Sequence, residues 1–145
     1  MFKHILLPID GSDLSLRAAK LGIELARTCG ARVYALHVVA PYHTIAYMAE
    51  MLAATEIIHT QDATTRAGQY LAEVQRMAAE AGVACASNYV FDDHPHEAII
   101  AMAREQHCDL TVMASHGWRG ITRLLLGSEV HKVLLESEMP VLVCR

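Results

Sequence analysis

The sequence predicts a doubly wound α/β fold: one five-stranded parallel sheet in the order 3-2-1-4-5, with helices on both faces. The 145 residues fit a single domain over residues 1–145, and 53% hydrophobic against 19% charged residues excludes a disordered chain. Short apolar runs, typical of buried strands, alternate with longer segments of helical spacing. No repeat or low-complexity tract interrupts this alternation, which favours an open parallel sheet wrapped by helices.

The first strand and helix have clear boundaries. Residues 5–9 form a continuous apolar run, the pattern of a strand covered on both faces. Apolar residues then recur with helical spacing over residues 14–29. Ser12 or Asp13 can cap the start of this helix, and Gly30 can end it.

The next strand is clear, but the segment after it is ambiguous. Residues 33–39 predict a second buried strand, and residues 67–81 carry the apolar face of a helix that ends at Gly82. Residues 40–61 read as a loop with a helical portion, which would form a lid or a partner surface. The apolar side chains of that portion are Tyr47, Met48, Met51 and Leu52.

The second half of the chain continues the alternation. Residues 83–90 make the weakest strand, because polar residues interrupt it, so we expect it at a sheet edge. Pro95 suits the first position of a third helix, after His94 as N-cap. Residues 110–114 predict a fourth strand. A glycine-containing loop, a helix that opens at Ser128 and a final strand, Val141–Cys144, complete the chain.

Composition excludes several classes of function. Twelve basic and sixteen acidic residues give a net charge of -4, and no basic run is present, so we expect no nucleic-acid partner. The four cysteines form no CxxC pair, which argues against a zinc knuckle or a dithiol redox centre and favours a reducing compartment. No apolar stretch is long enough for a signal peptide or a membrane span. We therefore expect a cytoplasmic protein that is not bound to a membrane.

A Rossmann-like sheet binds ligands outside the carboxyl ends of its strands, which directs attention to Asp10, Val39 and Ala114. The strongest local pattern follows the fourth strand, from Met113 to Ser128. Glycines there can turn backbone amides toward a ligand, and Gly127-Ser128 places free amides, a hydroxyl and the positive end of a helix dipole together. This is the composition of an anion site. Gly117 and Gly120 allow the turns, and Arg119 and Arg123 can add positive charge at the rim of the site. The alternative is a solvated loop in which Ser128 only caps a helix.

At these residues the chain resembles the universal stress protein family, from ILLPIDGSD at the start to PVLVCR at the end. Nucleotide-binding members of that family carry a glycine, two residues, a second glycine, nine residues, and then Gly-Ser or Gly-Thr. Gly117, the nine residues 118–126 and Gly127-Ser128 match this motif, whereas Ala114 replaces its first glycine.

The resemblance implies an ATP site, with ADP and AMP as alternative ligands and Mg²⁺ carried on the phosphates. It assigns adenine to Asp10 and Val38 with Pro8 shaping the pocket, and ribose to the backbone around Met113 and Ala114. It assigns the phosphates to Gly117, Gly127 and Ser128. From the residues alone, Asp10 could equally cap the first helix, and Val38 is a typical core residue.

Two residues depart from the family pattern. Ala114 adds a methyl group where the backbone would approach a sugar, a modest obstacle if its dihedrals are those of a strand. Glu129 follows Ser128 directly, at a position of the nucleotide site; it suits the helix dipole but would repel a triphosphate if it pointed inward, so we expect it to turn outward.

Other candidate sites are weaker. The run Asp92-Asp93-His94-Pro95-His96 contains metal-ligand residue types, but a polar turn before a helix accounts for it. Ser115 and His116 have no partner acid at a recognisable spacing, and no Gly-x-Ser-x-Gly motif is present, so a hydrolytic triad is not expected.

Two functions remain open. The first is a dimeric regulatory module of the stress response that binds ATP and is at most a slow ATPase, because no residue of the site is an obvious base for activating water. The second is a dimeric interaction module that has lost the nucleotide, with Ala114 and Glu129 as the marks of that loss. In both, the apolar strand Val141–Cys144 is expected at a sheet edge, where a second copy would pair with it.

Overall fold

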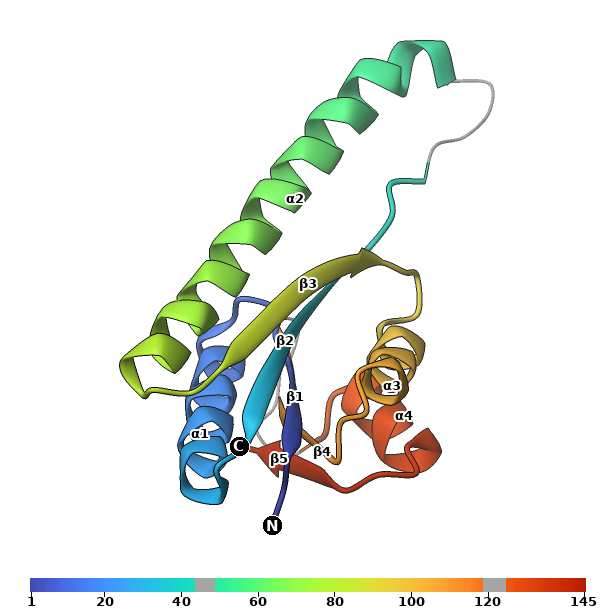
Figure 1. Cartoon of the computed structure of the whole chain (residues 1–145). Helices are drawn as coiled ribbons and strands as arrows, with labels where there is room; N and C mark the ends of the chain where they lie inside the picture. Colours follow the sequence, from blue (N-terminus) through green and yellow to red (C-terminus); the bar gives the residue numbers. More distant parts are fainter. Residues whose placement is uncertain (44–48, 119–124) are drawn as a thin grey trace.

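The computed structural model describes residues 1–43, 49–118 and 125–145, with only the backbone given for residues 49–52. Over these residues the chain forms one five-stranded sheet in the order β3-β2-β1-β4-β5, with every neighbouring pair parallel (Figure 1). The predicted fold class and strand order are confirmed. The strands are β1 (His4–Pro8), β2 (Arg32–Val39), β3 (Cys85–Phe91), β4 (Leu110–Ala114) and β5 (Val141–Cys144).

The central strand β1 and its neighbour β4 are the most buried strands. Every residue of β1 and β4 is buried, as the continuous apolar run of residues 5–9 predicts. The edge strands β3 and β5 are more exposed, and the position of β3 at an edge agrees with its interrupted pattern. The carboxyl ends of β1, β2 and β4 therefore meet at one edge of a rigid sheet.

Helices cover both faces of the sheet (Figure 1). One face packs against α1 (Asp13–Cys29) and α2 (Ala49–Glu80), and the other against α3 (Pro95–Glu105) and α4 (Ser128–Glu136). No helix in the described ranges has the length and hydropathy required to cross a bilayer.

The predicted helix boundaries are largely confirmed. The Ser12 hydroxyl accepts a hydrogen bond from the Ser15 N–H, and Gly30 ends α1 in the left-handed conformation at φ 66°. Pro95 begins α3 after His94, but the His94 side chain makes no capping bond. Gly127 occupies the N-cap position of α4, so α4 starts at Ser128 without a side-chain cap.

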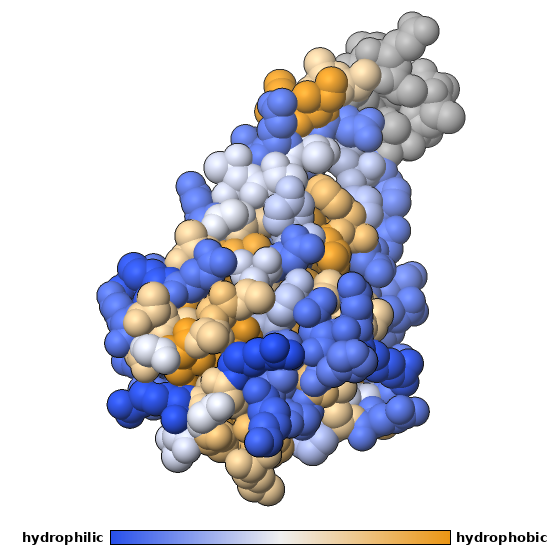
Figure 2. All heavy atoms as spheres, in the orientation of Figure 1, coloured by the Kyte–Doolittle hydropathy of each residue, from blue (hydrophilic) through white to orange (hydrophobic). Residues whose placement is uncertain are grey.

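The helix α2 is 32 residues long, far longer than the predicted segment 67–81. Its buried side chains begin at Ala63, so residues 53–62 have no buried face and their apolar residues lie on the surface. Figure 1 shows this end of α2 projecting beyond the sheet, and Figure 2 shows apolar surface there, where Ile57 and Ile58 are exposed. Tyr47 and Met48, and the side chains of Met51 and Leu52, lie outside the described part.

Candidate functional site

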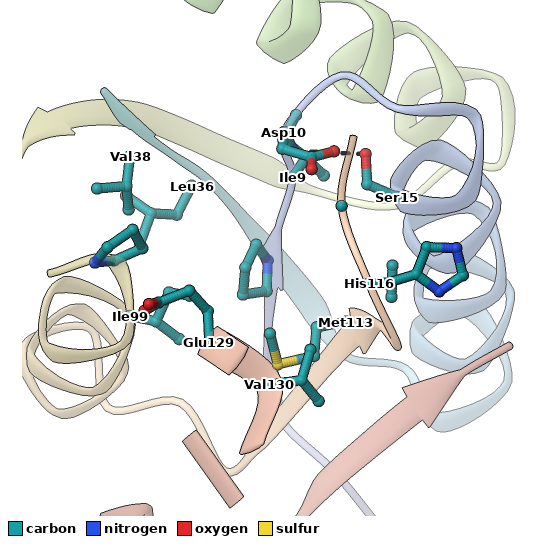
Figure 3. A pocket seen from close by; sticks show the side chains of 14 residues that line it. Ile9, Asp10, Ser15, Leu36, Val38, Ile99, Met113, His116, Glu129 and Val130 are labelled. Carbon is teal, nitrogen blue, oxygen red and sulfur yellow. Dashed lines mark hydrogen bonds between the residues drawn. The ribbon is translucent and has the colours of Figure 1, made fainter. Parts of the chain in front are cut away.

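A cavity of about 210 Å³ opens at the carboxyl ends of β1, β2 and β4 (Figure 3). Apolar side chains from the sheet and from the helices α3 and α4 form most of its wall. Polar groups come from Asp10, Ser15, His116 and Glu129. The apolar residues are Pro8, Ile9, Leu36, Val38, Pro95, Ile99, Met113, Ala114 and Val130. An apolar cavity with a few polar groups at this edge of a parallel sheet is a typical ligand site.

Most of the residues that the sequence assigned to a nucleotide site line this cavity. They are Pro8, Asp10, Val38, Met113, Ala114, Gly117 and Glu129. Gly127 and Ser128 are not in its wall and lie at the start of α4. Contact of these residues with a nucleotide stays a prediction.

Asp10 is fixed by the turn that joins β1 to α1. Its Oδ1 accepts a hydrogen bond from the Ser12 N–H at 2.9 Å, and its own N–H donates to the Ser15 hydroxyl at 3.3 Å. Because Ser12 supplies the cap of α1, Asp10 supports the turn without capping the helix itself. The Oδ2 atom lies against Gly117 and accepts no hydrogen bond from the described residues, so it keeps the capacity to accept one from a ligand.

The turn also depends on α2, which sequence reasoning did not connect to the site. Gly11 has φ 81°, and a Cβ atom there would lie 2.3 Å from the ring of Tyr70. The Tyr70 ring packs edge-on against His37 at 5.3 Å, and His37 Nδ1 lies 2.8 Å from the Ile9 carbonyl oxygen. Only glycine satisfies both the conformation and the space at position 11. The Gly-containing turn after a strand was the one signal for this contact.

The loop after β4 closes over the end of β1. The Trp118 indole N–H donates to the Asp10 carbonyl oxygen at 2.7 Å. A Cβ atom at position 117 would lie 2.2 Å from Asp10 Oδ2, so Gly117 allows the loop to touch the carboxylate. Arg119, Gly120 and Arg123, which the sequence placed at the rim of the site, lie outside the described residues.

Gly127 brings the start of α4 against the same loop. Its N–H donates to the Ser115 carbonyl oxygen at 2.7 Å, and a Cβ atom there would lie 3.2 Å from His116 Cα. No group in the described residues accepts a hydrogen bond from the amides of residues 128–130. These amides and the positive end of the α4 dipole can therefore attract an anion beside the cavity.

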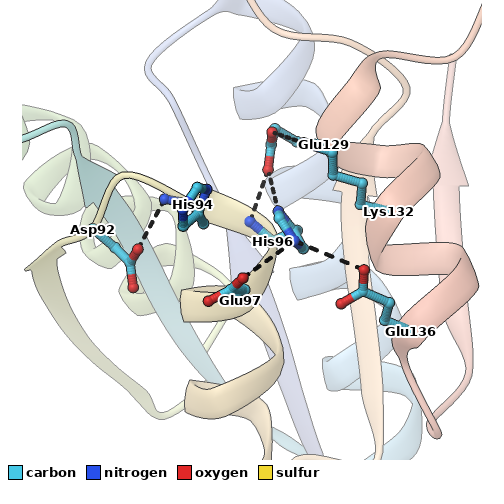
Figure 4. Close-up of polar contacts among 7 residues, drawn as sticks. All are labelled: Asp92, His94, His96, Glu97, Glu129, Lys132 and Glu136. Carbon is cyan, nitrogen blue, oxygen red and sulfur yellow. Dashed lines mark hydrogen bonds and ion pairs between the residues drawn. The ribbon is translucent and has the colours of Figure 1, made fainter.

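The expectation that Glu129 turns outward is wrong. Its Oε2 accepts a hydrogen bond from the His96 N–H at 2.8 Å and lies 2.9 Å from His96 Nδ1, while Lys132 Nζ is 3.4 Å from Oε1 (Figure 4). The His94 side chain leaves the first turn of α3 uncapped, and Glu129 supplies the missing acceptor from α4. This bond holds the carboxylate against the start of α3, and Glu129 is one of the residues that line the cavity.

Burial and hydrogen bonding have opposite effects on the pKa of Glu129. Burial alone would raise the pKa of this carboxyl, but hydrogen bonds from the backbone and ring of His96 and from Lys132 outweigh burial, so its pKa lies below the ordinary 4.5. Glu97 and Glu136 also approach His96 Nε2, at 3.9 and 3.8 Å. The sequence placed His96 in a polar turn but did not connect it to Glu129, because 33 residues separate the two.

The polar groups of the site can donate or accept hydrogen bonds. Ser115 Oγ and His116 Nδ1 lie 3.1 Å apart, and among the described residues this is the hydrogen bond that the His116 ring makes. Within the same residues, no three His, Cys, Asp or Glu side chains are arranged to hold a metal ion. The arrangement can therefore bind a molecule with an apolar body, hydrogen-bond donors for Asp10 and Glu129, and an anionic group near α4.

Comparison with known proteins agrees with this geometry. The model of the universal stress protein family matches residues 1–145. The chain is 36% identical to universal stress protein MJ0531 of Methanocaldococcus jannaschii, over all of this chain and 83% of that protein. It is 34% identical over the full length of both chains to a universal stress protein of Thermus aquaticus.

Solved structures share the fold. Protein MJ0577 of Methanocaldococcus jannaschii, a universal stress protein, superposes with a TM-score of 0.82 at 26% identity, over 99% of this chain and 96% of that one. A universal stress protein in complex with cAMP gives a TM-score of 0.74 at 24% identity, covering 99% and 97% of the two chains. One from Archaeoglobus fulgidus in complex with dAMP gives 0.64 at 19% identity, covering 100% and 98%. The family match over residues 1–145, together with the two curated relatives, shows that this chain belongs to the universal stress protein family.

Proposed function

We propose that this protein binds an adenine nucleotide, ATP or its less phosphorylated forms ADP and AMP, and acts as a dimeric regulatory module in the stress response. The observation that carries the proposal is the cavity at the ends of β1 and β4, which joins apolar walls, a free Asp10 oxygen and the uncapped start of α4. An adenine nucleotide matches these features with a flat ring system, amino and hydroxyl donors and a phosphate.

The cavity offers a place for each part of the ligand. The base would lie between Pro8 and Val38, with its amino group donating to Asp10. The ribose would approach the backbone of Met113 and Ala114. Ala114 does not have a positive φ, so the alanine that replaces the first glycine of the motif costs only the volume of one methyl group.

The phosphates would lie beside Gly117, Gly127 and Ser128, where the first amides of α4 point out of the helix. Mg²⁺ would arrive on the phosphates. Two proteins of this fold are described in complex with cAMP and with dAMP, which supports an adenine nucleotide as the ligand class.

Binding can be tested directly on the purified protein. Heat extraction should release an adenine nucleotide, and titration should change the fluorescence of Trp118, because its indole N–H bonds to Asp10 beside the cavity. Gly127→Ala places a Cβ atom 3.2 Å from His116 Cα and 3.3 Å from the Ser115 carbonyl oxygen. The loop must shift to accommodate it, so we expect affinity to fall by roughly tenfold.

The matched control is Gly68→Ala, since a Cβ atom at this glycine of α2 meets no atom within 4 Å. This variant should bind nucleotide as the wild type does. If the wild type releases no nucleotide and shows no response to millimolar AMP, ADP or ATP, the proposal is wrong.

A dimeric interaction module that binds no nucleotide is the second candidate. Its support is the edge strand β5, where Leu142 is 38% exposed, together with the departures at Ala114 and Glu129. Both candidates include pairing of two Val141–Cys144 strands, so the titration distinguishes them and the oligomeric state does not.

A further inference from the structure

The charged groups that line the cavity are both negative among the residues that the structure describes. Asp10 lies at the end of β1, and Glu129 lies on the other side of the cavity, in the first turn of α4 (Figure 3). No lysine or arginine of the described ranges is in the wall. A ligand inside this space therefore meets negative potential, and only the α4 amides favour an anion at its border.

Glu129 is held in place and cannot readily swing away from an anion. Its Oε2 accepts from the His96 N–H and contacts the His96 ring, which is itself buried. Three carboxylates, those of Glu97, Glu129 and Glu136, approach this ring, and one ammonium group, Lys132, approaches Glu129 (Figure 4). The corner between α3 and α4 therefore keeps a negative charge that Lys132 offsets only in part.

We propose that Glu129 is a specificity-determining residue, which makes the cavity favour adenine nucleosides and monophosphates over the triphosphate. This inference rests on the proposed function. An ionised carboxylate accepts hydrogen bonds from amino and hydroxyl groups of a nucleoside, whereas ionised phosphate oxygens have no proton to donate to it. Each added phosphate brings further negative charge toward a fixed carboxylate in a partly buried site.

The test is isothermal titration of AMP and ATP in EDTA, where ATP carries about two more negative charges than AMP. The wild type should bind AMP more tightly than ATP. Glu129→Gln removes the charge and keeps an acceptor oxygen for His96, so it should lower the Kd ratio of ATP to AMP by roughly fivefold or more. Excess Mg²⁺ should also lower the wild-type ratio, because the metal neutralises charge on the triphosphate.

Two further variants test whether the effect is specific to the charge of Glu129. Lys132→Met removes the ammonium 3.4 Å from Oε1 and should raise the ATP-to-AMP ratio, the opposite of Glu129→Gln. Glu136→Gln removes a carboxylate 3.8 Å from the same histidine ring but outside the cavity wall, and should keep the wild-type ratio.

An unchanged ratio in Glu129→Gln, or an equal change in Glu136→Gln, would overturn the role of Glu129 while nucleotide binding stands. Absence of binding to the wild type and to every variant would overturn the proposed function and this role with it.

Discussion

At the scale of single residues, Glu129 interacts with two helix starts at once. It lies in the first turn of α4, and its carboxylate accepts the His96 N–H in the first turn of α3. Both helix dipoles place positive charge at these ends, so one carboxylate stabilises two N-termini and joins the helices of one face. The same bond that holds α3 to α4 also fixes a negatively charged residue at the cavity wall.

This bond predicts a pH-dependent contribution to stability. The pKa of Glu129 lies below its ordinary 4.5, so the folded state favours the ionised form. The stabilisation is present above the unfolded pKa and is lost as pH falls through the folded pKa. Glu129→Gln should therefore lower the melting temperature at pH 7, and the difference from the wild type should shrink below about pH 4.5. Thermal unfolding monitored by circular dichroism at both pH values measures it. A difference that grows toward acidic pH would contradict this assignment.

The sequence correctly predicts the position of a site residue when that position depends only on the end of one strand. It does not predict a contact between side chains of two different helices. Asp10 follows β1 directly, so the topology alone brings it to the cavity. The orientation of Glu129 depends on the missing cap at His94 and on the distance between α3 and α4, neither of which a sequence pattern contains. The contacts of His96 and Tyr70 could not be predicted for the same reason, because their partners are distant in sequence.

At the scale of elements, α1 lies close to the sheet because a glycine faces it. Gly22 is buried, and a Cβ atom there would lie 2.4 Å from the Leu7 side chain of β1 and 3.4 Å from Val112 of β4. Leu7 and Val112 are fully buried, so neither has room to move aside. This close packing holds the middle of α1 against the sheet.

Two alanine substitutions in helical glycines should therefore have opposite effects. Gly22→Ala overpacks the contact with Leu7 and should destabilise the protein by roughly 1–3 kcal/mol. Gly68→Ala, in an exposed part of α2 with no atom within 4 Å, should stabilise it by about 0.5–1 kcal/mol through helix propensity. Urea unfolding of both variants gives the two free energies. Equal and small changes would show that the α1–sheet contact relaxes without cost.

Elements with a periodic buried face could be predicted, and those without one could not. The strands β1, β2 and β4 are apolar because both sides are covered, and α1 has a buried face over its whole length. The first half of α2 has no such face, since it extends past the sheet, so the sequence left residues 40–61 ambiguous.

At the scale of the whole molecule, the sheet has two unequal edges. The edge strand β3 is flanked by α2, which hydrogen-bonds to it through Gln75 and Ser87. At the other edge, β5 is short and apolar, and Leu142 is exposed. The carbonyl groups of Pro140 and Cys144 accept hydrogen bonds from the N–H groups of Thr111 in β4 and of Ser115 just after it. Alternation along a parallel strand therefore turns the backbone groups of Val141 and Val143 toward the free side.

The edge at β5 predicts a dimer that one proline can prevent. Val143→Pro removes an outward N–H and leaves the bonds to the Pro140 and Cys144 carbonyl groups intact. The wild type should sediment as a dimer at micromolar concentration, and the variant as a folded monomer. Leu142→Lys adds a charge to the same edge and should also be monomeric. Because it introduces no proline, it shows whether the loss of the dimer comes from the blocked edge or from a local effect of proline. Circular dichroism confirms that both variants remain folded. If the wild type is a monomer, or if both variants remain dimers, pairing through Val141–Cys144 is wrong and the exposed apolar surface of this edge serves another contact.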